Sequence, residues 1–151
     1  MPFKFRLEKV LTLRRDAVDQ AHMLVLKAQQ ALEITKNNLV KTAAELMQRN
    51  EDLIRENYKR AQDHMRVIKQ VSDKLEELKK ELVRREHELV QAKRDLLEAQ
   101  KKLEALEKLR EKQEEEYILE TNRAEQRETD EKATLKFANE LLQQQRQELE
   151  D

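Results

Sequence analysis

The chain of 151 residues contains no glycine, and its single proline stands at position 2. Glycine and proline supply most of the tight reversals of compact domains, so this chain has few places where it can turn. Charged residues make up 42% of the sequence and aromatic residues only 3%, which is typical of coiled coils and long helices. We therefore expect an all-α protein whose core is the seam between two helices.

Apolar residues recur every seven positions along two stretches of the sequence, the repeat that joins helices into a coiled coil. The first row is Leu11, Val18, Val25, Leu32, Leu39, Leu46 and Leu53, with the companions Leu7, Arg14, Ala21, Ala28, Thr35, Thr42 and Arg49. The second row is Ile54, Ala61, Ile68, Leu75, Leu82, Leu89, Leu96 and Leu103, with the companions Val71, Leu78, Arg85, Ala92, Ala99 and Leu106.

The phase of the repeat breaks between Leu53 and Ala61, where apolar residues are scarce and Asn and Asp are frequent. The capping residues Ser72 and Asp73 suggest a competing turn, but the repeat passes through them without a change of phase. We expect one hairpin domain over residues 1–151, with a helix over about residues 3–50, a turn over about residues 50–58 and a helix over about residues 58–145.

A turn near residue 55 pairs residues whose numbers add to about 110. Large side chains then face small ones, for example Leu89 against Ala21 and Leu82 against Ala28, which fills an antiparallel seam closely. The pairing ends near residue 107, so the remainder is expected to overhang as an unpaired helix, which is marginal by itself and needs a partner. The expected fold is a long two-helix antiparallel coiled-coil hairpin with an overhanging C-terminal helix.

The chemical groups that enzymes and metal sites use are scarce. Serine occurs only at Ser72, cysteine is absent, no glycine-rich phosphate loop exists, and His22, His64 and His87 lie far apart in the sequence. We expect surface histidines, no catalytic residue, no cofactor and no metal. The sequence predicts a protein that acts by binding other proteins.

The charge balance and hydropathy of the chain exclude further classes. Its 31 basic and 32 acidic residues lack the basic excess of nucleic-acid-binding proteins. No apolar run approaches the roughly 20 residues of a membrane span, and the N-terminus interleaves basic with apolar residues where a signal peptide would be purely apolar. We expect a cytoplasmic protein with no nucleic acid partner.

Two segments carry motifs. The N-terminal segment FKFRLEKVL, residues 3–11, has the form F-x-F-x-L-x-x-V-L. The second motif is Leu106-x-x-Leu109-x-x-Lys112, followed by Glu120-x-x-Arg123-x-Glu125-Gln126-x-x-x-Asp130-Glu131. Together with Asn57-Tyr58 at the expected start of the second helix, these segments resemble the FliJ family of flagellar export proteins.

The resemblance implies an antiparallel hairpin similar to the central stalk of rotary ATPases. It implies that the chain binds the hexameric flagellar export ATPase, the cytoplasmic domain of the export gate, and export chaperones. It also implies a peripheral location at the cytoplasmic face of the inner membrane.

Carried over residue by residue, the resemblance implies two sites. The residues facing the ATPase ring would be Arg110, Glu120, Arg123, Glu125, Gln126, Asp130 and Glu131. The residues contacting the export gate would be Tyr58, Ala61 and Met65. Ala61 is smaller than the bulky residue that the family pattern has there.

An alternative from another class is a parallel homodimeric scaffold or spacer unrelated to export, in which the two rows belong to one long helix with a skip near residue 53. The hairpin predicts a monomer as the isolated chain, whereas the spacer predicts a dimer.

Overall fold

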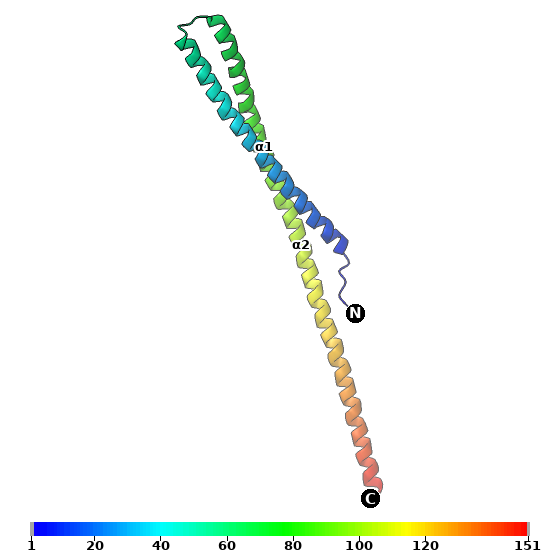
Figure 1. Ribbon diagram of the computed structural model, residues 1–151. Helices are drawn as coiled ribbons and strands as arrows, with labels where there is room; N and C mark the ends of the chain where they lie inside the picture. The colour runs from blue at the N-terminus through cyan, green and yellow to red at the C-terminus, as the bar shows by residue number, and fades with distance from the viewer. Residues whose placement is uncertain (1, 151) are drawn as a thin grey trace. The chain divides into compact units, whose positions relative to one another are not determined.

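The computed structural model describes residues 2–150, which contain two helices. Helix α1 comprises Glu8–Arg55 and helix α2 comprises Ala61–Glu150. The chain reverses between them, and the two helices pack against each other in opposite directions (Figure 1). This confirms the expected all-α hairpin, and the alternatives of one continuous helix or of a turn at Ser72 and Asp73 are wrong.

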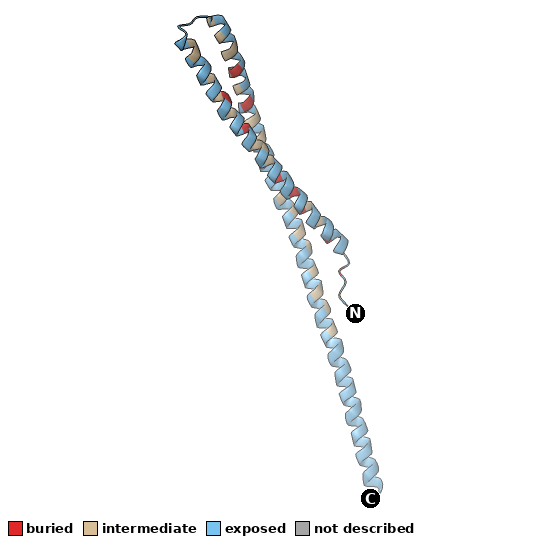
Figure 2. Cartoon of the chain, viewed as in Figure 1, coloured by how far each residue is buried: buried red, intermediate tan, exposed pale blue. Residues whose placement is uncertain are grey.

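Contacts divide the chain into two units that are described separately. The hairpin unit is residues 12–103, and the terminal unit combines residues 2–11 with residues 104–150. In the hairpin unit, every member of the predicted rows and companions is buried or half-buried except Arg49 and Ile54. In Figure 2, buried (red) and half-buried (tan) segments of this unit lie mainly where its two helices face each other. The most deeply buried members are Val18, Ala21, Val25, Thr35, Thr42, Val71 and Leu78.

Thr35 and Thr42 are small polar residues of α1 that lie buried in the apolar seam. The Thr35 hydroxyl donates a hydrogen bond to the carbonyl of Ala31 at 3.0 Å, so its polar atom is satisfied within its own helix and its methyl group is free to pack. Throughout residues 2–150, no buried side-chain polar atom lacks a hydrogen-bond partner. The seam therefore carries no desolvation cost from orphaned polar groups.

The pairing register of the hairpin differs from the predicted one by a whole heptad. The reversal is centred midway between the helix ends, a few residues later than predicted. Residues 21–31 of α1 and residues 85–95 of α2 consequently line one groove. Leu89 thus lies at the level of Ala28, where the prediction had Ala21. A shift of seven residues keeps large side chains opposite small ones, so the repeat alone fixes the pairing only to within whole heptads.

The N-terminal segment of the terminal unit is not helical, so α1 begins at Glu8 and not near Phe3. Phe3, Phe5 and Leu7 are buried or half-buried, whereas Lys4 and Arg6 between them are exposed. Residues 2–5 lie outside any helix or strand, and Arg6 and Leu7 form a turn that a hydrogen bond from the Glu8 amide to the carbonyl of Phe5 closes at 3.2 Å. Non-helical backbone can advance up to about 3.3 Å per residue against about 1.5 Å in a helix, so residues 2–5 reach further along α2 than a helix of equal length.

The N-terminal segment contacts α2 beyond the point where the sequence predicted the paired region to end. The ring of Phe3 lies 5.6 Å from the ring of Tyr117, beyond the predicted end near residue 107. Thr121 is the last half-buried residue of α2, and every residue from 122 to 150 is exposed. Residues 122–150 are called the C-terminal extension below.

Replacing Leu11 by Ala tests the buried end of α1. Leu11 is the one large side chain with no solvent exposure among the described residues, so its truncation is expected to lower the free energy of unfolding by about 2–4 kcal/mol. Leu13→Ala is the matched control, because Leu13 is 66% exposed and should cost less than about 0.5 kcal/mol. Urea unfolding followed by circular dichroism measures both, and equal losses would contradict this assignment.

Candidate partner-binding surfaces

The tip of the hairpin turns without glycine. Asn57, Tyr58 and Arg60 have positive φ angles of 52°, 61° and 54°. For residues other than glycine this left-handed conformation costs roughly 1–2 kcal/mol, least for Asn. The tip is thus a strained segment that must be held by local hydrogen bonds.

A Schellman motif supplies part of that support. The Tyr58 amide donates to the carbonyl of Leu53 at 3.1 Å, and the Asn57 amide donates to the carbonyl of Ile54 at 3.0 Å. These are the two hydrogen bonds of the motif, and Asn57 occupies the left-handed position that usually takes Gly or Asn. The Asn57-Tyr58 pair therefore ends α1, and the expectation that it opens the second helix is wrong.

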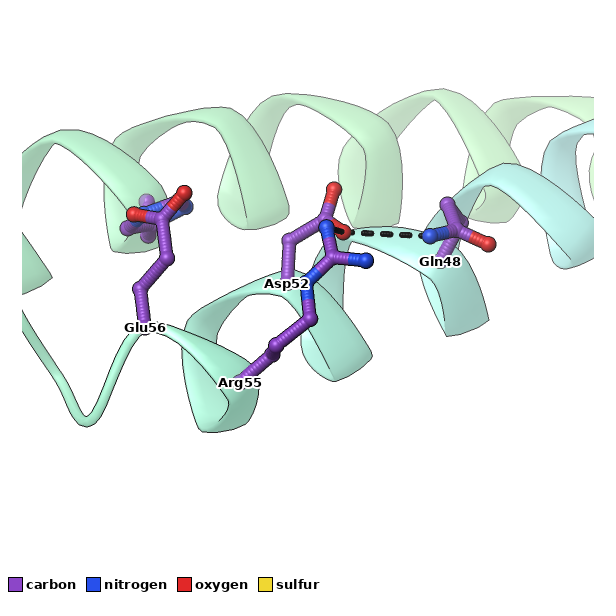
Figure 3. A network of polar contacts seen from close by, with 5 residues as sticks. Gln48, Asp52, Arg55 and Glu56 are labelled. Carbon is purple, nitrogen blue, oxygen red and sulfur yellow. Dashed lines mark hydrogen bonds and ion pairs between the residues drawn. The ribbon is translucent and has the colours of Figure 1, made fainter.

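Side chains reinforce both ends of the tip. Asp52 accepts hydrogen bonds from Gln48 at 3.0 Å and from Arg55 at 2.7 Å, and Figure 3 shows Asp52 between these two residues on the last turns of α1. Across the turn, the Nε2 atom of His64 lies 2.7 Å from a carboxylate oxygen of Glu56. His64 is only 19% exposed, so it bridges the turn to α2 and is not the surface histidine expected.

The predicted gate residues lie at this tip with unequal exposure. Tyr58 is 64% exposed and Met65 is 62% exposed, whereas Ala61 is half-buried at the start of α2. Ile54 is also 62% exposed, because it belongs to the last turn of α1 and not to the seam row in which the sequence placed it. The tip thus presents three exposed apolar side chains, those of Ile54, Tyr58 and Met65.

Six of the seven predicted ring residues are exposed on α2 between Glu120 and Glu131. With about 3.6 residues per turn, five of them share one half of the helix surface and Glu125 points to the other. Gln126 donates a hydrogen bond to Asp130 at 3.1 Å, within the same helix. No tertiary contact within residues 2–150 occupies these side chains.

Arg110, the seventh predicted ring residue, differs from the others. Its Nε atom donates to a Glu8 carboxylate oxygen at 3.2 Å, which links α2 to the first turn of α1. The two side chains are 39% and 51% exposed, so solvent screens the pair and its contribution to stability is at most about 1 kcal/mol. Arg110 therefore has an intrachain partner where the other six have only solvent or their own helix.

Arg85 lies at a seam position of the hairpin unit. Glu88 accepts a hydrogen bond from it at 3.0 Å and raises the pKa of the guanidinium, and Glu81, at 3.4 Å, acts in the same direction. Both carboxylates belong to α2 itself. The ion pairs of Arg85 therefore do not join the two helices, and its stem packs in the seam while its head reaches water.

The comparison with known families decides the identity. Residues 3–142 match the family described as Flagellar FliJ protein. The chain belongs to the FliJ family. The match spans α1, the tip and most of the C-terminal extension, which confirms the resemblance found in the sequence and makes this FliJ family chain a component of flagellar or type III protein export.

A solved structure shows the same fold. It is a Chlamydia trachomatis protein described as a candidate YscO homolog, with a TM-score of 0.69 at 22% identity, and the similarity covers 89% of this FliJ family chain and 94% of that protein. No curated protein matches the sequence. No helix within residues 2–150 has an apolar stretch long enough to cross a membrane.

The strain at the tip predicts a stabilising substitution. Arg60→Gly removes the penalty of a positive φ, which outweighs the added freedom of glycine in the unfolded chain, so the free energy of unfolding is expected to rise by about 0.5–1 kcal/mol. Arg60→Ala keeps the penalty and should not gain stability. Chemical denaturation of both variants measures the difference, and a destabilised Arg60→Gly chain would refute the strain argument.

Proposed function

We propose that this FliJ family chain is the stalk-like component of a flagellar type III export apparatus and that its C-terminal extension binds the ring of the export ATPase. The observation that carries the proposal is the extension itself, a continuous helix whose every residue is exposed and which holds five of the seven predicted ring residues. A charged helix of this kind is marginal in water alone and is completed by a partner.

The dimensions of a helix suit a ring lumen. A single α-helix with its side chains is about 10–12 Å wide, much slimmer than a helical pair. Exposed charges along it meet complementary charges of a partner, and such contacts fix orientation and speed association more than they add affinity. The chain acts in this proposal by binding and not by catalysis.

The tip is assigned to the export gate. Tyr58 on the turn and Met65 in the second turn of α2 present apolar area to solvent, and hydrogen bonds hold the turn between the helices. Aromatic side chains on preorganised backbone contribute strongly to protein interfaces, because little conformational entropy is lost when they bind. Ile54 extends the same surface, and Ala61 contributes less because it is half-buried.

The remaining parts of the proposal concern partners and place. The chain escorts export chaperones between cargoes and works in the cytoplasm, peripherally at the inner membrane. The hairpin folds within one chain, so in dilute solution the isolated protein is a monomer.

Reversing two charges of the extension tests ring binding. The variant Arg123→Glu/Glu125→Lys keeps the net charge but inverts the pattern, so binding to the purified export ATPase is expected to weaken at least about tenfold, with loss of ATPase stimulation and of motility. Co-purification and calorimetry measure this. The matched control is Arg84→Glu/Glu86→Lys, an exposed pair of the same spacing in the hairpin unit, which should bind normally. Unchanged binding by the extension variant would refute the proposal.

Truncating the tip tests the gate. Tyr58→Ala/Met65→Ala is expected to weaken binding to the isolated cytoplasmic domain of the export gate roughly tenfold, because the exposed apolar anchors are lost. Binding to the ATPase should persist, since the extension is intact. Val90→Ala/Leu97→Ala, which removes apolar area with 47% and 53% exposure from the hairpin unit, serves as the control. Equal loss in both variants would show that the tip is not the gate surface.

A further inference from the structure

The C-terminal extension carries a further heptad row, which no part of the described chain covers. Leu135, Leu142 and Leu149 stand seven residues apart and are 65%, 54% and 87% exposed. Ala124 and Ala138 occupy the companion row and are also exposed. These positions are the seam of a coiled coil that lacks its other strand.

We propose that the missing strand is the C-terminal extension of a second copy of this chain, running antiparallel. In this pairing, the numbers of two facing residues add to about 273. Each seam leucine then packs into a hole between side chains on the helix of the other copy. Leu135 then faces Ala138 of the second copy, and Leu149 faces Ala124 of the second copy. The two-fold symmetry repeats both layers, so large side chains meet small ones four times.

The charges beside the seam select this pairing. Arg127 comes opposite Glu148 of the second copy, and Glu125 comes opposite Arg146 of the second copy. By symmetry each pair forms twice. None of these four side chains takes part in an ion pair within residues 2–150, so each is available to a second copy.

Polar seam residues also find matches. Glu128 faces Gln145 of the second copy, whose amide can donate a hydrogen bond to the carboxylate. Polar layers of this kind fix the register of a coiled coil and lower its stability. The layer of Leu142 with Glu131 has no such match, which makes the dimer weak and reversible.

Other pairings of the same two strands bring like charges together. In a parallel, in-register pair, Glu128 and Glu131 each meet their own copy inside the seam, and Arg127 flanks Lys132. An antiparallel pair shifted by one heptad sets Lys132 against itself and Glu120 against Glu148. Like charges in these places are destabilising, so the sequence favours one arrangement over both alternatives.

The dimer would cover part of the surface that faces the export ATPase. Glu125 flanks the new seam and Glu131 lies within it, so a chain paired through its extension cannot also present these residues to the ring. This consequence rests on the proposed function, whereas the pairing itself does not. Self-association would then hold the extension in a protected form until a ring is available.

Cysteine cross-linking tests the arrangement, and the chain has no cysteine of its own. Ala124→Cys and Leu149→Cys chains, mixed at a concentration where the full chain sediments as a dimer, are expected to form a mixed disulfide and few disulfides between identical variants. In the antiparallel pair, identical positions lie roughly 37 Å apart, too far for a disulfide. Disulfides formed mainly between identical variants would indicate a parallel pair and overturn the proposal.

Charge exchange gives an independent measurement. Arg127→Glu is expected to weaken dimerisation about tenfold in sedimentation equilibrium, because two attractive pairs become repulsive, and Arg127→Glu/Glu148→Arg should restore it. Phe137→Ala is the control, since Phe137 is 62% exposed on the same extension but lies off the seam. A chain that stays monomeric at every concentration, or a double variant that fails to recover, overturns the proposal. Direct binding of the monomer to the ATPase is measured separately, so the two proposals fail independently.

Discussion

The packing of large side chains against small ones along a single seam holds the hairpin together. A two-helix protein has no third layer, so each seam residue is covered from one side only, and most are half-buried. Alanine and threonine on α1 let the larger residues of α2 approach closely, which recovers contact area that a leucine-on-leucine seam would lose to steric crowding.

The seven-residue repeat predicts which face of each helix is buried but not the exact pairing. Leu89 has equally good small partners in Ala21 and Ala28, because they stand one heptad apart. The choice between them is made at the turn, where hydrogen bonds from Asn57 and Tyr58 end α1. Asn57 is the sequence signal for the end of α1, because Asn is, after Gly, the residue that most often takes the left-handed position there.

The candidate sites show the same division between what a pattern can and cannot predict. Exposure of the charged residues near Arg123 follows from a helix without a partner, and the sequence indicated it. The ion pair of Arg110 with Glu8 could not be foreseen, because it depends on how far the N-terminal residues extend. Residues 2–5 are not helical, but a segment this short gives too weak a pattern to outweigh the helical repeat that follows it. The contact of His64 with Glu56 could not be predicted either, since it exists only once the turn is formed.

The extension and the hairpin each carry a heptad row that needs a second helix to cover it, but only the hairpin has that helix within the same chain. Within the hairpin, α1 and α2 are held at a high effective concentration by a short turn, so even half-buried layers suffice for a stable pair. The extension has an apolar row of similar spacing but no tethered partner, and it must gain its second strand from another molecule. Its seam contains the carboxylates Glu128 and Glu131, whose burial costs free energy and keeps any such pairing weak. An extension that dimerised tightly could not bind the ATPase ring, and the two glutamates in its seam keep the proposed dimer reversible.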